Sequence, residues 1–245
     1  MGQATCDTTA EPSLERLLEH PAIWRGRSVA RTATLSTGCT RLDEALPGGG
    51  WPAAGLTEIL TARSGLGELR LLVPLLARLG AQPPPRWAVW VSPPFEPYAP
   101  ALIAAGVPLE RQLVVRTAEP AWVIEQSLDS GGAALVLAWL APGVATSLTV
   151  LRRLQLATQR SGAPAFLFRP LTEAKRTSPA ELRLVFEPQV TGGRIQLLKS
   201  RGGERRPLEL RWQEFSLRES ALRESALREG ALQERALQEN DDVAP

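Results

Sequence analysis

The sequence predicts an α/β fold with a mostly parallel, helix-flanked β-sheet and a C-terminal antiparallel extension. Residues 87–92 (WAVWVS) and 133–140 (AALVLAWL) are short runs dominated by apolar residues, as is typical of buried parallel strands. Segments with leucines at helical spacing alternate with these runs, and that alternation favours parallel strands joined by helices. Beyond residue 182, two apolar runs flank a Thr-Gly-Gly turn, which indicates a hairpin.

The individual elements follow from apolar spacing and from the glycines and prolines that interrupt it. The predicted strands are residues 56–60, 87–92, 113–115, 133–140, 164–168, 182–188, 194–200 and 208–212. One predicted helix begins at Leu14. The other predicted helices span 37–46, 68–79, 100–105, 121–130 and 147–160. Pro74 falls inside one of them, where it either kinks the helix or marks its true start. We expect an N-terminal segment (1–34), a core (35–212) and a low-complexity tail (213–245).

The turn after the first core strand has the layout of a phosphate-binding loop, in which backbone N–H groups and a helix N-terminus hold phosphates. A working loop reads GxxxxGK[ST], and here Gly65 and Gly67 supply the glycines of the turn. When Gly67 is taken as the second glycine of the motif, Ala62 replaces the first glycine, Glu68 the lysine and Leu69 the Ser/Thr. The phosphate-binding cation and the Mg²⁺-binding hydroxyl are both lost. We therefore expect no cofactor and no ATP hydrolysis.

The strand at 133–140 lacks a further ATPase residue. In an active enzyme this strand ends in an aspartate that holds Mg²⁺, whereas the matching position here is Ala138, or Trp139 if the register slips by one. A single histidine and two cysteines in the whole chain leave little for a catalytic triad, a metal cluster or a disulfide framework. The sequence therefore predicts a protein that is not an enzyme and has no metal site.

Residues 35–60, LSTGCTRLDEALPGGGWPAAGLTEIL, resemble the start of a RecA-type ATPase core. Together with GLGELRLL at 65–72, they more closely resemble the ImuA family, the RecA-like translesion DNA synthesis-associated proteins of bacterial damage-induced mutagenesis operons. Further similar runs lie at 131–140, 151–169, 178–188 and 195–212. The resemblance spans roughly residues 14–212 and implies that 35–212 form a RecA-like core with a degenerate nucleotide site.

The resemblance implies a function as a non-catalytic accessory protein of mutagenic translesion DNA synthesis. The two cysteines form no disulfide framework, so the cytoplasm is the expected location. The partners that the resemblance implies are ImuB, which is a polymerase-like adaptor, and an error-prone DnaE-type polymerase. RecA is a further expected partner, because a RecA-like surface can dock on the end of a RecA filament. Two alternatives stay open: an SOS-type cell-division inhibitor that acts by protein binding, and a recombinase-like DNA-binding protein. No motif separates the division inhibitor from the accessory protein.

Charge is unevenly distributed along the chain. The net charge is −2 over residues 1–151, +8 over 152–211 and −4 over 212–245. A basic segment of this kind is suited to weak, sequence-independent DNA binding, although a solvated surface or an acidic partner explains it equally well. The DNA-binding candidates lie in two predicted turns of the basic segment: Arg169, Lys175, Arg176, Arg201, Arg205 and Arg206.

The tail repeats a five-residue unit, SLRES-ALRES-ALREG-ALQER-ALQEN. Successive leucines rotate by about 140° on a helix, so they form no stripe, and we expect a solvated, marginal helix. Partner-binding candidates are apolar residues on either side of the predicted core: Leu14, Leu17, Leu18, Phe215, Leu217 and Leu222. No apolar run approaches the ~20 residues of a membrane span, and the start MGQATCDTTAEP does not resemble a signal peptide.

Overall fold

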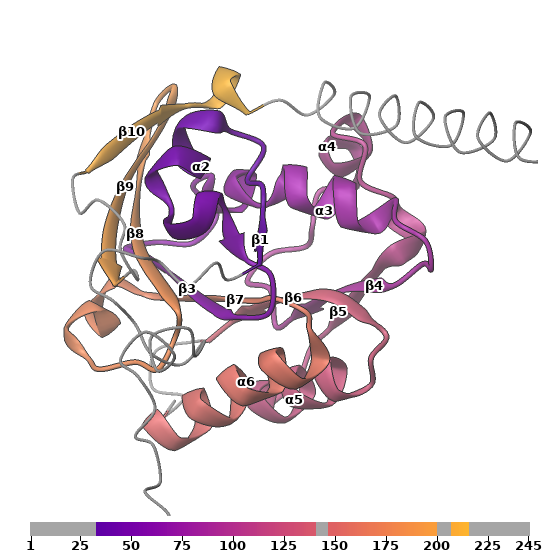
Figure 1. Ribbon diagram of the computed structural model, residues 1–245. Coiled ribbons are helices and arrows are strands. Elements are labelled where there is room, and N and C mark those ends of the chain that lie inside the picture. The colour runs from indigo at the N-terminus through magenta and orange to yellow at the C-terminus, as the bar shows by residue number, and fades with distance from the viewer. Residues whose placement is uncertain (1–32, 141–146, 200–206, 216–245) are drawn as a thin grey trace, which may run out of the picture.

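The computed structural model describes residues 33–140, 147–199 and 207–215 and is built around an eight-stranded sheet (Figure 1). The strand order is β10-β9-β8-β3-β7-β6-β4-β5. The strands from β8 to β5 in this order are parallel, whereas β9 and β10 are antiparallel to their neighbours. Their bounds are β3 (Leu56–Thr61), β4 (Trp87–Val91), β5 (Gln112–Val115), β6 (Ala133–Trp139), β7 (Ala165–Pro170), β8 (Leu182–Gln189), β9 (Gly192–Lys199) and β10 (Leu208–Arg211).

Helices cover both faces of this sheet (Figure 1). On one face lie α2 (Thr40–Ala45), α3 (Val73–Gly80) and α4 (Ala99–Ala104), and on the other lie α5 (Pro120–Asp129) and α6 (Leu148–Ser161). A separate two-stranded sheet pairs β1 (Thr34–Leu35) with β2 (Trp51–Pro52). The protein is thus mixed α/β with a mostly parallel sheet and an antiparallel C-terminal extension. A RecA-like core remains a prediction.

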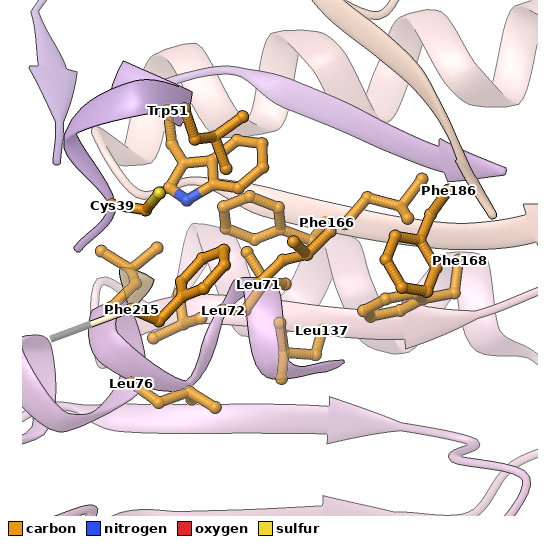
Figure 2. Packing of buried hydrophobic residues seen from close by; sticks show 14 of the residues in the cluster. Cys39, Trp51, Leu71, Leu72, Leu76, Leu137, Phe166, Phe168, Phe186 and Phe215 are labelled. Atoms are coloured by element: carbon orange, nitrogen blue, oxygen red, sulfur yellow. The ribbon is translucent and has the colours of Figure 1, made fainter. Parts of the chain in front are cut away.

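Two hydrophobic clusters hold the layers together, one on each face of the sheet. The larger cluster joins α2, α3 and α4 to the sheet and contains most of the aromatic residues (Figure 2). Within it, Trp51 packs edge-on against Phe166 with ring centroids 5.5 Å apart. The smaller cluster joins α5 and α6 to the opposite face. Because a parallel sheet carries helices on both faces, its central strands are buried on both sides, and every residue of β3 is buried.

The segment predicted as one helix over 68–79 consists of two elements. A 3₁₀ turn, η2 (Glu68–Leu71), precedes α3, and Pro74 lies in the first turn of α3. A proline is tolerated there because the N–H groups of the first turn have no partner within the helix. Pro74 therefore marks the start of the helix and does not kink it.

The packed core extends beyond the last strand. After β10 the chain forms a 3₁₀ turn, η5 (Trp212–Glu214), and Phe215 is 7% exposed within the larger cluster. Its ring lies 5.9 Å from that of Trp212, and Arg41 of α2 pairs with Glu214 at 2.8 Å. Phe215, predicted as a partner contact outside the core, is instead part of the core, because its side chain is buried in the larger cluster beside the ring of Trp212.

Several predicted residues lie outside the part of the chain that the structure describes. These are the partner-binding candidates Leu14, Leu17, Leu18, Leu217 and Leu222 and the basic residues Arg201, Arg205 and Arg206. Within the described ranges, no helix is long and apolar enough to cross a membrane.

Candidate functional site

The glycine loop after β3 is closed by its own glutamate. Gly65 and Gly67 have φ angles of +84° and +105°, a left-handed conformation that favours glycine. The turn brings the carboxylate of Glu68 back onto the loop, where Oε1 accepts from the N–H of Gly65 at 2.6 Å and Oε2 from the N–H of Leu66 at 2.9 Å. Glu68 is 3% exposed. The carboxylate thus engages two backbone donors of a loop whose layout is suited to phosphate.

The structure also shows the surroundings of the two other replaced motif positions, Leu69 and Ala62. Leu69, at the Ser/Thr position, packs against the larger hydrophobic cluster. Ala62, at the first glycine position, is exposed. The structure therefore brings Glu68 together with Gly65 and packs the side chain of Leu69 against the core.

Two aromatic rings border the loop, and sequence reasoning assigned neither of them to the site. A Cβ atom added to Gly65 would lie 2.7 Å from the ring of Phe95, and one added to Gly67 would lie 3.1 Å from the ring of Trp212. The guanidinium of Arg70 lies 4.9 Å from the centroid of the Trp212 ring, a cation–π contact. The two glycines themselves were the signal in the sequence, because a glycine often marks a position where another group lies too close for a side chain.

The carboxyl end of β6 is apolar and aromatic. Ala138 is fully buried. The ring of Trp139 lies between those of Phe168 and Trp90, with centroid distances of 4.5 and 5.9 Å and an interplanar angle of 11° for each pair. In either register, the position where an ATPase carries its Mg²⁺-binding aspartate has no carboxylate.

A buried ion network crosses the middle of the sheet, and the sequence analysis missed it. Glu58 of β3 is 0% exposed. Its carboxylate accepts from Arg169 Nη1 of β7 at 2.9 Å, from Arg183 Nε of β8 at 2.7 Å and from Ser178 Oγ at 2.7 Å. Arg169 Nη2 also donates to Glu173 at 2.6 Å. The network therefore links three neighbouring strands through charge-assisted hydrogen bonds.

The structure describes three of the DNA-binding candidates, and this network buries one of them and leaves the other two exposed. The side chain of Arg169 is 3% exposed and is held by Glu58 and Glu173, so it is not presented to a nucleic acid in this structure. Lys175 is exposed, and the side chain of Arg176 is 68% exposed. Both line a cavity of about 370 Å³ that also contacts Ser147, the N-cap residue of α6. DNA binding through Lys175 and Arg176 remains a prediction.

The thiol of Cys39, the N-cap residue of α2, is buried. Burial raises the pKa of this thiol, and the nearby carboxylates of Glu214 and Asp43 raise it further, against the opposing effect of backbone hydrogen bonds. A thiol with a raised pKa is largely protonated at neutral pH and is a poor nucleophile. Cys39 is therefore a structural residue.

The fold and the loop define a class: a mixed α/β protein whose glycine loop is occupied by its own carboxylate. The family model of the cell division inhibitor SulA matches residues 56–164. This segment runs from the start of β3 to just before β7. It includes Glu68 and Ala138 but ends before Arg169, Arg183 and Trp212.

Individual relatives carry two different names. The cell division inhibitor SulA of Photorhabdus laumondii is 38% identical over 120 residues, which cover 46% of this chain and 63% of that protein. SulA of Edwardsiella piscicida is 37% identical over 105 residues, covering 41% and 58%. Protein ImuA of Caulobacter vibrioides is 33% identical over 143 residues, covering 54% and 55%. ImuA relatives are therefore present, but these SulA proteins match at higher identity, and the chain spans about six tenths of their length.

Proposed function

We propose that this protein inhibits cell division, as the name of the SulA relatives describes, and that it does so as a non-enzymatic factor of the bacterial DNA-damage response that binds another protein. The observation that carries the proposal is the similarity to SulA, both in the family model over residues 56–164 and in relatives of up to 38% identity. The cytoplasm is the expected location, and a RecA-like core is the expected architecture.

The chemistry of the site supports binding without turnover. Two backbone donors of the loop already hold the carboxylate of Glu68, and Leu69 packs into the core. Ala138 offers no ligand for Mg²⁺. Phosphoryl transfer requires groups that position the phosphates and a metal ion. The loop and the end of β6 lack such groups.

One of the two edges of the sheet, that of β5, is suited to binding a protein. Among the described strands, β5 pairs with β4 alone, so its other edge is open. An open edge presents unpaired backbone groups to a partner. The segment from β4 to β5 also exposes six large apolar side chains: Trp87, Phe95, Tyr98, Ile103, Leu113 and Val114. We place the contact with the division machinery here, within the segment that matches SulA.

The test is expression of the full chain in a rod-shaped bacterium, with cell length as the readout. We expect filamentous cells, and normal length for a double variant with Ile103→Glu and Leu113→Lys. Leu156→Glu is the matched control, because Leu156 is an exposed apolar residue on α6, on the opposite face of the sheet. Normal cell length with the unaltered chain at high soluble expression would count against division inhibition.

A second function is favoured by a separate observation. The match to ImuA covers 54% of this chain, more than the 46% covered by the leading SulA match, and the motif at 35–60 begins before the SulA segment. This reading gives the protein a role in translesion synthesis, with a polymerase-like adaptor, an error-prone DnaE-type polymerase and RecA as partners and with weak DNA contacts. Loss of damage-induced mutation on gene deletion, with unchanged cell length on expression, would favour it over division inhibition.

A further inference from the structure

We propose that Glu68 is a built-in ligand of the glycine loop, and that the loop becomes a binding site for a small inorganic oxyanion once this carboxylate is removed. The inference goes beyond the proposed function, since it concerns the loop alone and holds for either cellular role. The ligand class is phosphate or sulfate.

The contacts are those of an anion site. Each carboxylate oxygen of Glu68 has its own backbone donor, at 2.6 Å from the N–H of Gly65 and 2.9 Å from the N–H of Leu66. Successive N–H groups in a turn that includes left-handed residues form a concave anion-binding nest. The φ angle of +84° at Gly65 sets up this arrangement. The loop thus keeps the backbone geometry that binds oxyanions, and the oxyanion is part of the chain.

Backbone donors are the groups that hold this carboxylate. Among the ion pairs of the described residues, none includes Glu68, although the residue is 3% exposed. The nearest cation in sequence, Arg70, lies over the ring of Trp212. A buried carboxylate held by N–H groups uses the chemistry by which glycine loops hold phosphate. Removing it would free those two N–H groups, which belong to exposed residues of the loop, for water or for an oxyanion from solution.

The surroundings of the loop argue against a nucleotide as the ligand. The ring of Phe95 borders the loop at Gly65, and that of Trp212 borders it at Gly67. Leu69, where a nucleotide site has its Mg²⁺-binding hydroxyl, packs against the core. An apolar ring beside each glycine and a leucine at the hydroxyl position supply nothing for the metal that accompanies a nucleoside triphosphate, which favours inorganic phosphate or sulfate as the ligand.

The experiment compares thermal unfolding of the full chain with that of its Glu68→Ala variant in chloride, phosphate and sulfate at matched ionic strength. We expect the variant to unfold at a lower temperature in chloride. Phosphate at ten times its dissociation constant should then raise the melting temperature of the variant by about 3–5 °C more than that of the unaltered chain. Glu44→Ala is the matched control, because Glu44 is an exposed glutamate on α2.

Binding is checked directly by broadening of the phosphorus NMR line of inorganic phosphate, expected with Glu68→Ala and absent with the unaltered chain. If phosphate and sulfate stabilise all three proteins equally, the proposal is overturned. Should Glu68→Ala not fold in chloride, its refolding yield in phosphate becomes the readout, and equal failure in both salts refutes the idea. A larger shift with Mg-ATP than with phosphate would refute the ligand class. Cell length plays no part in these outcomes, so the division role stands or falls separately.

Discussion

Replacing Glu58 with alanine should destabilise the fold severely, because the change leaves two buried arginines without their shared carboxylate. Glu58 is fully buried, and the side chains of Arg169 and Arg183 are 3% and 7% exposed. Removing one partner of a buried ion pair typically lowers stability by about 3–5 kcal/mol. Here Arg169 keeps Glu173 at 2.6 Å, and Arg183 keeps two backbone carbonyls at 2.9 and 3.0 Å. We therefore expect the lower part of that range, about 3–4 kcal/mol.

The measurement is urea unfolding followed by tryptophan fluorescence and circular dichroism. In thermal unfolding the same loss corresponds to a decrease in melting temperature of roughly 6–16 °C for a chain of this size. A triple variant with Glu58→Leu, Arg169→Met and Arg183→Met should recover most of the loss, since replacing buried charges together by apolar side chains is often neutral or stabilising. A loss below ~1 kcal/mol for Glu58→Ala, or a triple variant no better than the single one, would refute the reasoning.

Three further outcomes are expected. Because the folded-state pKa of Cys39 is raised, the unfolded thiol ionises first, from about pH 8.5. The free energy of unfolding should therefore fall by up to ~1.4 kcal/mol per pH unit above that pH, and Cys39→Ala should remove this slope in urea titrations. Phe215→Ala should cost about 3–5 kcal/mol, and a chain ending at Phe215 should unfold cooperatively whereas one ending at Arg211 should not, as calorimetry can show. Lys175→Ala with Arg176→Ala should weaken retention on immobilised DNA at low salt and reduce its salt dependence; unchanged retention would remove these two residues from the list of DNA contacts.

The sequence predicts those parts of the fold that depend on local pattern. Fully apolar runs such as those of β4 and β6 identify buried strands without knowledge of their neighbours. The order of strands in the sheet was not predicted, because β3 pairs with β7 and β8, which lie more than 100 residues further along the chain. Pairing at such distances leaves no local periodicity in the sequence.

The candidate site was predictable to the same degree. Counting along the motif identified Glu68, Leu69 and Ala138, but it could not show that the carboxylate of Glu68 turns back onto the loop. Glu58 was missed because a single acidic residue in an apolar strand does not indicate its partners, which lie 111 and 125 residues away. Phe215 was misassigned because the repeat that follows it concealed the end of the core.

The position of β3 constrains the order in which the protein can assemble. β3 lies early in the chain, yet its two neighbours in the sheet, β7 and β8, are synthesised more than 100 residues later, and Glu58 has no arginine partner until Arg169 and Arg183 have been synthesised. Contacts between residues so far apart in sequence require closing long loops and slow the search for the native sheet. A nascent chain that ends at residue 164 contains the whole SulA-like segment, but β3 lacks both flanking strands and its buried charge is uncompensated. The matched segment is therefore not expected to form its native sheet alone, and the chain completes that sheet only after the strands β7 to β10 have been made.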